Sequence, residues 1–535
     1  MSGAREGNLD MRHEAHFGDR VVRCFVERDA DTWGVFERAV ARRPDAEAVV
    51  EGGLRLTYRD LQAAVERVAA GLHRLGLGAG ERVGVLLGNR PEFVVAVLAA
   101  LRLGAVAVPI GTRLAAGEVR YILEHCEARL LLFDDEAAGA AAGLHGLSGL
   151  RATVRCGGAA GALSFGDLPD GGAPPPERRS PGEEETAFLL YTSGTTGLPK
   201  GAMLTHLNVW HSLRHFALAH RLGDGERSLL AVPATHVTGL VAIVLSMINV
   251  GGTVVMLPAF KARTFLEVAA RERVTHTVLV PAMYNLVLRD PERAAFDLSA
   301  WRLGSYGGAP MPEAAIVALG EWLPRLALVN GYGATETASP TSLTPIGEGL
   351  ARRETVGKPV ACADVLVVDD EGREVPRGTA GEIWIRGPMV VPGYWRDAAA
   401  TAASFTAGYW HSGDIGSIDD EGYLRLIDRK KDMINRGGYK IYSVEVENVL
   451  AQHPAVFECA VVARHCPVLG ERVHAYVSRL SPDLSAGQIV DFCAGRLADY
   501  KVPETFTLTD EPLPRSSAGK VLKRTLRDQL REAQT

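Results

Sequence analysis

The sequence predicts an α/β protein: a large N-terminal domain of several subdomains with βα-layered sheets, followed by a small α+β C-terminal domain. Its 535 residues are too many for one ordinary hydrophobic core, so more than one domain is expected. Helix-period segments alternate with short apolar segments, which is typical of parallel sheets. We therefore predict an N-terminal domain over residues 1–428, a junction near 429–432 and a C-terminal domain over 432–535.

Predicted helices and strands alternate from about residue 56 onward. Each helix has apolar residues at a spacing that places them on one face, and each strand is a short apolar run. Strands joined through helices pair in parallel, so this order implies parallel sheets. The helices are expected at 57–76, 91–103, 239–250 and 261–272, and the strands at 82–87, 106–109, 253–257 and 276–280.

The segments between and after these elements have a different composition. Residues 138–185 are rich in Gly, Ala and Pro, which favours loops and edge structure ahead of an apolar strand at 187–190. Further on, short alternating strands are expected at 363–368, 381–386 and 423–427. Alternation in short strands is typical of antiparallel sheets, so these residues predict a small antiparallel subdomain that closes the N-terminal domain.

The C-terminal domain has a β/α order of its own. Ser443 can cap a helix, because a serine hydroxyl satisfies the unpaired N–H groups of a first helical turn. The expected elements are a helix at 443–452, strands at 456–463 and 473–480, a helix at 485–497 and a last helix from about Val521. Such an order in a short segment predicts a small α+β domain.

The run at residues 191–201, Tyr-Thr-Ser-Gly-Thr-Thr-Gly-Leu-Pro-Lys-Gly, combines hydroxyls, glycines and one lysine. Glycines let the backbone approach a ligand closely, so that successive N–H groups can point at phosphate oxygens. The hydroxyls add donors and Lys200 adds a mobile positive charge. No G-x-x-x-x-G-K-[ST] pattern fits the run, which argues against a P-loop NTPase. Because it follows an apolar strand directly, the run predicts a polyphosphate-binding loop rather than an ordinary surface turn.

Composition and charge exclude several classes of protein. The hydrophobic fraction is 47% and the net charge is only -6, with no basic stripe, so a globular enzyme is expected and nucleic acid is not expected as a partner. No apolar run approaches the length of a membrane span, and charged residues near the N-terminus argue against a signal peptide. A cytoplasmic location is expected. Seven cysteines without C-x-x-C spacing predict reduced thiols rather than disulfides or a zinc site.

The run at 191–201 closely resembles the phosphate-binding motif of the acyl-adenylate-forming enzymes, which include acyl-CoA and aryl-CoA ligases, amino-acid adenylation domains and firefly-type luciferases. Four further segments of the chain resemble other motifs of that superfamily and occur in the same order. They are residues 330–337, 409–414, 428–434 with 437–441, and 514–520. The resemblance covers nearly the whole chain. It implies an N-terminal adenylation domain and a small, mobile C-terminal lid that swings about a hinge near 429–432.

The resemblance implies that ATP and Mg²⁺ bind at these motifs. Lys520 is expected to bridge the carboxylate of the acid and the α-phosphate of ATP. Glu336 is expected to be the magnesium carboxylate, assisted by a hydroxyl from Thr192. Asp414 would accept hydrogen bonds from the ribose hydroxyls, and Arg429 would donate to the same sugar. Taken alone, Asp414 could equally cap a turn.

Further residues complete the implied nucleotide site. A loop and the end of the 330–337 segment would bracket the adenine, with the ring of Tyr332 as a stacking face. The phosphate run would hold the polyphosphate. The nucleotide-binding residues that the resemblance implies here are Ser193, Gly194, Thr195, Thr196, Gly197, Lys200, Gly308, Ala309, Pro310, Asn330, Gly331, Tyr332, Gly333 and Thr335.

His236 lies in a segment, 233–239, that resembles the superfamily's segment ahead of the acid pocket. There the histidine orients the bound carboxylate and can gate CoA entry, although a lone histidine could also be structural. Residues 234–240 contain no aspartate to hold an α-ammonium, which disfavours an amino acid as substrate. An aromatic or medium-chain acid is expected. The other residues expected in this pocket are Val237, Thr238, Val241, Tyr306, Met311 and Ala338.

The resemblance also implies a second half-reaction after rotation of the lid. Lys431 is the expected hinge residue. One orientation would present Lys520 for adenylation, and the other would present Gly437, Gly438 and Tyr439 as the wall of a tunnel for CoA. The two glycines could equally form a simple turn.

The implied activity is that of an ATP-dependent carboxylic acid–CoA ligase, in which an acyl-adenylate forms with release of pyrophosphate and CoA then displaces AMP. A stand-alone ligase that loads the acid onto a carrier protein is the alternative, since only the thiol acceptor differs. A luciferase-like oxygenase is disfavoured. A catalytically inactive nucleotide-binding regulator is also disfavoured, because Lys520, Glu336, Asp414 and Arg429 are all present. The sequence does not indicate an oligomeric state.

Overall fold

The computed structural model of the chain describes residues 10–144, 147–157, 163–166, 168, 175–178, 180–192, 198–515 and 521–532. The chain divides into two compact units. The first unit comprises Met1–Gly308, Ala315–Val365 and Ile385–Trp410, and the second comprises Ala309–Ala314, Leu366–Trp384 and His411–Thr535. The second unit thus takes in short stretches ahead of residue 428, and the domain boundary expected there stays a prediction.

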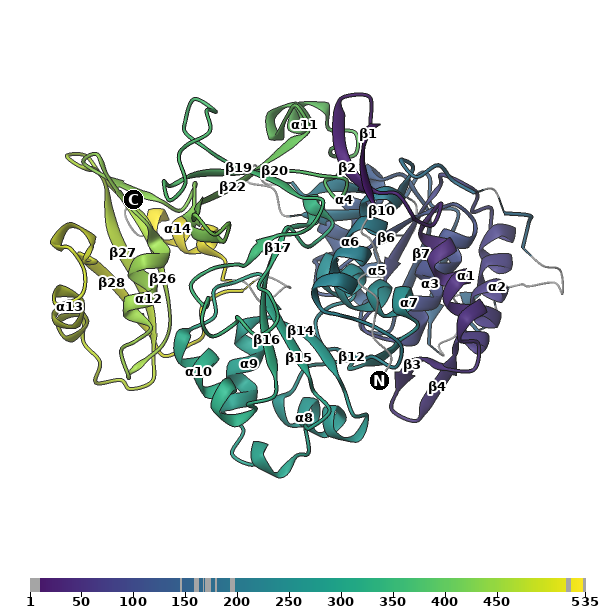
Figure 1. The fold of residues 1–535 in the computed structure, drawn as a ribbon, viewed down its shortest axis with the longest axis horizontal. Coiled ribbons are helices and arrows are strands. Elements are labelled where there is room, and N and C mark those ends of the chain that lie inside the picture. Colours follow the sequence, from purple (N-terminus) through teal and green to yellow (C-terminus); the bar gives the residue numbers. More distant parts are fainter. Residues whose placement is uncertain are drawn as a thin grey trace. The chain divides into compact units, whose positions relative to one another are not determined.

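A seven-stranded sheet in the first unit contains the strand that precedes the polyphosphate run. Its order is β11-β10-β6-β5-β7-β8-β9, and every pair is parallel except β10 with β11. Strands β10, β6 and β7 of this sheet are labelled in Figure 1. Helical crossovers produce parallel pairing, as the alternating pattern predicts. The strands are β5 Arg82–Leu86, β6 Val106–Pro109, β7 Ala128–Asp134, β8 Ala152–Cys156, β9 Leu163–Ser164, β10 Thr186–Thr192 and β11 Lys200–Thr205.

A nine-stranded sheet forms the other half of the first unit. Its order is β18-β17-β16-β15-β14-β12-β13-β3-β4. The central strands pair in parallel, whereas β4, β17 and β18 add antiparallel edges. The strands are β3 Glu47–Glu51, β4 Leu54–Thr57, β12 Arg227–Leu230, β13 Thr253–Met256, β14 His276–Leu279, β15 Leu303–Gly307, β16 Ala327–Tyr332, β17 Ser342–Leu343 and β18 Lys358–Pro359.

One hydrophobic core joins the two sheets and the helices between them. It includes Val83 of β5, Val254 of β13 and Phe93 of α3, a helix that is buried on nearly every side. Among the described residues no helix is long and apolar enough to cross a membrane. The α-helices before residue 410 are α1 Thr32–Arg42, α2 Tyr58–Arg74, α3 Pro91–Arg102, α4 Ala116–His125, α5 Ala138–Ala141, α6 His206–Ala219, α7 Ser246–Val250, α8 Ala262–Arg271, α9 Pro281–Leu288, α10 Glu313–Trp322 and α11 Ala398–Ser404.

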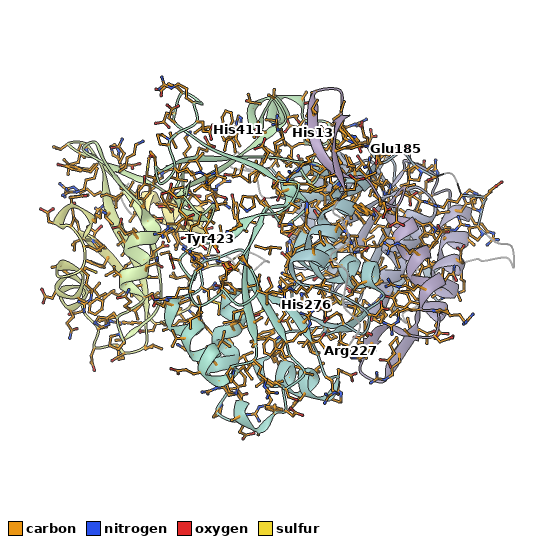
Figure 2. The ribbon with its side chains drawn as sticks, viewed as in Figure 1. His13, Glu185, Arg227, His276, His411 and Tyr423 are labelled. Carbon is orange, nitrogen blue, oxygen red and sulfur yellow. The ribbon has the colours of Figure 1, made fainter. Side chains whose placement is uncertain are left out.

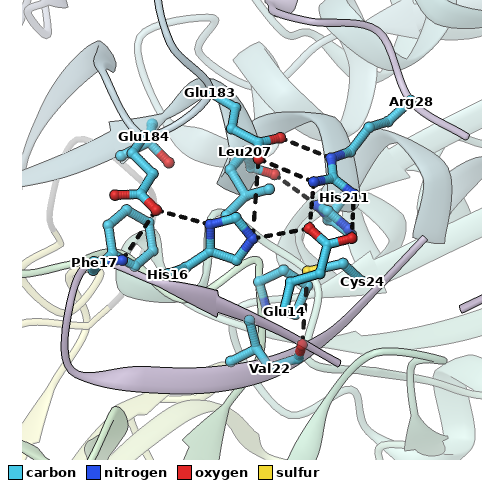
Figure 3. Close-up of polar contacts among 12 residues, drawn as sticks. Glu14, His16, Phe17, Val22, Cys24, Arg28, Glu183, Glu184, Leu207 and His211 are labelled. Atoms are coloured by element: carbon cyan, nitrogen blue, oxygen red, sulfur yellow. Dashed lines mark hydrogen bonds and ion pairs between the residues drawn. The ribbon is translucent and has the colours of Figure 1, made fainter. Parts of the chain in front are cut away.

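An N-terminal hairpin precedes these elements and is not predicted from the sequence. Its strands are β1 Met11–His16 and β2 Arg20–Phe25. Arg28 forms bidentate hydrogen bonds with Glu14 (2.5 and 3.0 Å) and with Glu183 (2.7 and 2.9 Å), as Figure 3 shows. The ring nitrogens of His16 contact Glu14 (3.2 Å) and Glu184 (2.8 Å). These charged contacts attach the hairpin to the segment that leads into β10.

Besides His16 of the hairpin, five of the described histidines of the first unit are buried: His206, His211, His215, His220 and His276. His211 shows why they are neutral, since its Nε2 accepts the backbone N–H of Phe25 (3.2 Å) and its Nδ1 donates to the carbonyl of Leu207 (2.9 Å). A nitrogen of His220 lies 3.1 Å from one of His276, which is labelled in Figure 2, so one of the two must present a lone pair. Burial lowers the pKa of every one of these five rings.

All seven cysteines are free thiols, and six of them are buried. Burial raises the pKa of Cys24 and of Cys126 to about 12, so both thiols stay protonated at neutral pH. This environment agrees with the expectation of reduced thiols.

A five-stranded sheet follows the nine-stranded one in the chain. Its order is β19-β20-β22-β21, and β23 pairs with β22. The central strand β22 is antiparallel to both β21 and β23, as expected for the small antiparallel subdomain. The strands are β19 Asp364–Val368, β20 Gly381–Arg386, β21 Phe405–Thr406, β22 Tyr409–Ile418 and β23 Leu424–Arg429.

The second unit contains the expected α+β fold. The sheet order is β25-β24-β27-β26, with β28 parallel to β27, and a hydrophobic core lies between this sheet and its helices. The elements are β24 Ile434–Arg436, β25 Tyr439–Ile441, α12 Ser443–Leu450, β26 Val456–Cys466, β27 Gly470–Arg479, α13 Ala486–Ala494, β28 Thr505–Thr509 and α14 Lys523–Glu532.

The cap expected for helix α12 is wrong. Ser443 is the first helical residue, and the N-cap position is Tyr442, which makes no side-chain cap bond. Instead the carboxylate of Asp428 accepts hydrogen bonds from both the backbone N–H and the hydroxyl of Ser443. A carboxylate from strand β23 therefore satisfies the helix N-terminus, and a distant partner of this kind leaves no local signal.

Candidate active site

The polyphosphate run joins the two strands of the β10–β11 hairpin. β10 ends at Thr192 and β11 begins at Lys200, and these two residues are directly opposite one another in the antiparallel register. Both side chains of such a pair lie on the same face. The other predicted phosphate contacts, Ser193, Gly194, Thr195, Thr196 and Gly197, lie outside the described residues and stay predictions.

A third segment extends the face of the hairpin that carries Thr192 and Lys200. Tyr394 faces Ala202 of β11 in an antiparallel bridge, and Trp395 N–H donates to the carbonyl of Gly201 (2.7 Å). Side chains alternate along a strand, so Lys200 and Ala202 point to the same face. The side chain of Tyr394 therefore lies on the face that Thr192 and Lys200 share.

Glu336 meets this face from a separate element, the short 3₁₀ helix η3 Thr335–Thr337, which directly follows the sequence expected near adenine. The residue is only 8% exposed. Its Oε1 lies 3.5 Å from Oγ1 of Thr192, and its backbone carbonyl accepts the N–H of Val391 (2.9 Å). The structure thus brings together the two side chains predicted to hold magnesium, although they are 144 residues apart.

Tyr394 completes this cluster and is missed by the sequence analysis. Its hydroxyl donates to Oε1 of Glu336 (3.0 Å), and its ring lies 5.2 Å from Nζ of Lys200. Burial and the Glu336 carboxylate raise the pKa of Tyr394, so the hydroxyl remains a donor. The only sequence signal is an aromatic pair after a glycine, outside every predicted element.

The residues predicted around adenine lie at the ends of two neighbouring parallel strands. Tyr306 of β15 is aligned with Asn330 of β16, and Gly307 with Gly331. A Cβ on Gly307 would lie 2.3 Å from the carbonyl oxygen of Gly331, so the strands approach closely only because Gly307 lacks one. The carboxyl ends of parallel strands are a common place for nucleotides, which fits the prediction.

The remaining adenine residues fall on both units. Gly308 has a left-handed backbone (φ +78°) that favours glycine, whereas Ala309 and Pro310 belong to the second unit, as does Met311 of the predicted acid pocket. The amide of Asn330 donates to the carbonyl of Thr355 (3.0 Å). Tyr332 is buried, and Gly333 and Thr335 lead from it to Glu336.

The predicted wall of the acid pocket begins with a π-helix. The sequence predicts a helix over 239–250, but Thr238–Leu245 is a π-helix that continues as α7. A Cβ on Gly239 would lie 2.3 Å from the carbonyl oxygen of Pro233, so the backbone of the π-helix packs closely against the segment before it only because residue 239 is a glycine. π-Helical turns recur at functional sites. His236 is half-buried just ahead of it, and Thr238 begins it.

The apolar pocket residues belong to a continuous cluster. Val237, Val241 and Ala338 are members of the same hydrophobic core. Tyr306 is 1% exposed, and its hydroxyl has no hydrogen-bond partner among the described residues, while burial raises its pKa to about 12. A buried hydroxyl of this kind is available to a polar group of a ligand.

Asn89 fixes the backbone ahead of His236, and this role was not predicted from the sequence. Its side-chain amide donates to the carbonyl of Val232 (3.0 Å) and also lies near those of Leu230 (3.4 Å) and Leu257 (3.2 Å), while its Oδ1 accepts the N–H of Ala234 (2.8 Å). The residue is buried. One amide thus ties together the ends of β12 and β13 where the predicted pocket begins.

The predicted ribose pair lies in the second unit. Asp414 of β22 and Arg429 of β23 are directly opposite one another, and Nε of Arg429 lies 2.8 Å from Oδ1 of Asp414. The carboxylate is almost fully buried, whereas the guanidinium side chain is about half exposed. The two groups are close enough to share one ligand, and the carboxylate is a partner in an ion pair rather than only a turn cap.

The predicted hinge and tunnel residues follow this pair. Lys431 is exposed in the turn between β23 and β24. Gly437 (φ +59°) and Gly438 (φ +96°) form the left-handed turn of the β24–β25 hairpin, which explains both glycines without a tunnel. Tyr439 is exposed and stacks on Tyr500, with ring centroids 4.6 Å apart. Lys520 lies outside the described residues.

A cavity of about 430 Å³ opens elsewhere on the first unit, between α1, α6 and α7. Arginines of α1 and α6 and the ring of Trp210 contribute to its wall. None of the predicted site residues lines it, so it is not part of the predicted site.

Comparison with known proteins identifies the family. The chain matches the AMP-binding enzyme model over residues 36–395 and the AMP-binding enzyme C-terminal domain over residues 445–520. The chain belongs to the AMP-binding enzyme family. The resemblance to acyl-adenylate-forming enzymes and the predicted fold class are thereby confirmed.

Relatives of this AMP-binding enzyme are similar over almost their full length. Feruloyl-CoA synthase of an Amycolatopsis species is 36% identical over 498 residues, which cover 92% of the chain and 97% of the relative. Long-chain-fatty-acid–CoA ligase FadD13 of Mycobacterium tuberculosis is 35% identical over 93% of the chain and 98% of the relative. The solved structure of o-succinylbenzoate CoA synthetase (MenE) of Bacillus subtilis with ATP and magnesium ion has a TM-score of 0.81 at 30% identity, covering 93% and 99%.

The side chains that meet in this AMP-binding enzyme fit a magnesium ion carried by ATP. Glu336 offers a carboxylate and Thr192 a hydroxyl, and oxygen donors of this kind are those that Mg²⁺ takes together with substrate phosphates. Lys200 adds a positive charge on the same face, next to the run predicted to hold the phosphates. The arrangement can therefore bind and neutralise a polyphosphate.

Proposed function

We propose that this AMP-binding enzyme is an ATP-dependent carboxylic acid–CoA ligase. The observation that carries the proposal is the meeting of Thr192, Glu336 and Lys200 beside the polyphosphate run. The named CoA ligases among its relatives support it. ATP and CoA are cytoplasmic metabolites, so we place the enzyme in the cytoplasm.

In the first half-reaction a carboxylate oxygen of the acid attacks the α-phosphorus of ATP, and pyrophosphate leaves as the bond between the α-phosphorus and the bridging oxygen breaks. Glu336 and Thr192 would hold the Mg²⁺, which neutralises charge on the phosphate oxygens. Lys520 would draw the two anionic reactants together, and Asp414 with Arg429 would hold the ribose. In the second half-reaction the thiol of CoA attacks the acyl carbon, and AMP leaves.

We infer an aromatic or medium-chain acid as the substrate. The predicted pocket residues Val237, Val241 and Ala338 are apolar and buried, which disfavours a second charge on the acid. The buried Tyr306 hydroxyl would offer a single polar contact inside that wall. Lys431 as hinge and Gly437, Gly438 and Tyr439 as tunnel wall remain part of the proposal.

Pyrophosphate release over panels of benzoates, cinnamates and fatty acids tests the function. We expect release to depend on both the acid and Mg²⁺, and acyl-CoA and AMP to appear in equal amounts by mass spectrometry when CoA is added. If the acyl-adenylate forms but only a phosphopantetheinylated carrier protein is acylated, the carrier-loading alternative is correct. ATP binding without pyrophosphate release for any acid would indicate a regulator.

Phenylalanine is expected to be a much poorer substrate than 3-phenylpropionate. No acidic residue occurs in 234–240, so the ammonium of phenylalanine would enter an apolar wall without a partner. Burying such a group costs at least roughly 2 kcal/mol, which corresponds to about thirtyfold or more in rate. Pyrophosphate release at matched concentrations measures the ratio, provided that 3-phenylpropionate is itself a substrate. Equal rates would show that the pocket contains an anionic partner and would favour amino-acid adenylation.

A further inference from the structure

Tyr394 is held by contacts with the chain that follows it. Its backbone N–H donates to Oγ1 of Thr401 in α11 (3.0 Å), and its ring meets the ring of Phe405 edge-on, with centroids 6.0 Å apart. A Cβ on Gly393 would lie 2.6 Å from the side chain of Thr401, so the absence of a side chain lets α11 approach. The backbone of Tyr394 is therefore held by α11, and its ring packs against Phe405 of β21.

The same residue is also tied to the phosphate hairpin. Met203 N–H donates to the carbonyl of Gly393 (3.1 Å), and Ala202 pairs with Tyr394 across the bridge. The hydroxyl end of the ring consequently has a defined position relative to β11. A shift of the hairpin by ligand contacts would be transmitted to Tyr394 through these backbone bonds.

The hydroxyl of Tyr394 is hydrogen-bonded to the carboxylate of Glu336. Tyr394 donates to Oε1 of Glu336 (3.0 Å), and Thr192 Oγ1 approaches the same oxygen (3.5 Å). Two contacts to one oxygen fix the rotation of the carboxylate and hence the direction of its second oxygen. Hydrogen bonds of this kind orient the ligands of a metal and tune its affinity.

The ring of Tyr394 acts on a second group of the site. Nζ of Lys200 lies 5.2 Å from the ring centroid, a distance at which the face of an aromatic ring attracts a cation. One residue thus contacts both the expected magnesium carboxylate and the lysine opposite Thr192.

We propose that Tyr394 is a positioning residue that sets the orientation of the Glu336 carboxylate for Mg²⁺ and holds Lys200 over its ring for the phosphates of ATP. This inference rests on the proposed function, because it assigns Glu336 to magnesium. It adds a residue from a different part of the chain to the motifs that carry the site.

Tyr394→Phe tests the inference, because it removes a single oxygen and keeps the ring. Binding of Mn²⁺ in the presence of a non-hydrolysable ATP analogue, followed by electron paramagnetic resonance, should weaken about tenfold to a hundredfold. The Mg²⁺ concentration for half-maximal pyrophosphate release should rise by a similar factor, while the rate at saturating Mg²⁺ recovers to within a few-fold. A merely structural defect would lower the rate at every Mg²⁺ concentration without moving the half-saturation point.

Tyr58→Phe is the matched control. The hydroxyl of Tyr58 is also buried and hydrogen-bonded, since it donates to the carbonyl of Gly252 (2.7 Å) in the same unit. This variant should keep the Mn²⁺ affinity of the unmodified enzyme. Tyr394→Leu, which removes the ring as well, should in addition raise the apparent KM for ATP, because Lys200 loses its aromatic contact.

Glu336→Gln separates the failure of this inference from that of the proposed function. If Glu336→Gln loses Mn²⁺ affinity and Tyr394→Phe does not, the inference about Tyr394 is wrong and the magnesium assignment stands. If Glu336→Gln also binds Mn²⁺ with unchanged affinity, the assignment of Glu336 is wrong and the inference falls with it. Weakened Mn²⁺ binding in both variants, with the Tyr58→Phe control unchanged, supports the inference.

Discussion

Lys520→Ala is expected to lower acyl-AMP formation by about a hundredfold or more, while thioester formation from supplied acyl-AMP survives. The lysine would bring the carboxylate and the α-phosphate together, and removing one preorganised charge from such a step raises the barrier by roughly 3 kcal/mol. Pyrophosphate release measures the first half-reaction. Acyl-CoA produced from synthetic acyl-AMP measures the second.

The chain on both sides of Lys520 is anchored, so Lys520→Ala is expected to leave the surrounding fold in place. Arg515 and Val521 pair in an antiparallel bridge, and Lys523 forms an ion pair with Glu447 (2.6 Å). Arg524→Ala is a suitable control, because its side chain is 60% exposed and it removes a nearby positive charge without touching the site. Equal loss of both half-reactions in Lys520→Ala would mean that the lysine is structural.

The regular parts of the fold could be predicted because their signal is local. Alternating helix-period and apolar segments predicted the parallel sheets. The observed helix Tyr58–Arg74 begins and ends within about two residues of the expected 57–76. The π-helix could not be anticipated. Thr238–Leu245 is apolar nearly throughout, so no polar stripe reveals whether its turns are α or π.

Contacts between distant segments were the part of the site that the sequence could not supply. The motifs placed Thr192 and Glu336 in one site, but Tyr394, 58 residues beyond Glu336, belongs to no predicted element. Asn89 is similar, since its partners are backbone carbonyls of β12 and β13. The N-terminal hairpin was not predicted because charged pairs such as Arg28 with Glu14 hold it, and buried and exposed residues do not alternate along β1.

The protein is expected to lose stability steeply as the pH falls below about 6.5. Five buried histidines of the first unit, His206, His211, His215, His220 and His276, are neutral when folded, with pKa values lowered to about 4 for His206 and His211 and to about 3 for His220. In the unfolded chain the same rings have a pKa near 6.5. Between these values the unfolded state binds more protons than the folded state, so the free energy of unfolding decreases as pH decreases.

The effect is large because the five histidines act together. One pH unit below 6.5 each ring contributes roughly 1.4 kcal/mol, or about 7 kcal/mol for the set, which is comparable with the whole stability of a typical domain. Carboxylates contribute at lower pH. Hydrogen bonds from Arg28 lower the pKa of Glu14 from its ordinary value of 4.5 to about 2. The stability that Glu14 contributes is therefore lost only as the pH falls below about 4.5.

Urea unfolding at a series of pH values from 8 to 5 measures this dependence, with a nearly flat free energy above pH 7 and a steep decline below 6.5. His211→Gln should reduce the slope by about one proton, because the ring that cannot be charged in the folded state is gone. His13→Gln is the control: His13 is exposed on β1, as Figure 2 shows, and should leave the slope unchanged. A free energy that stays flat down to pH 5, or a slope insensitive to His211→Gln, would mean that the buried rings accept protons without unfolding. The bond from the Phe25 N–H to Nε2 of His211 would then have to break in the folded protein, which would remove one contact between the N-terminal hairpin and α6.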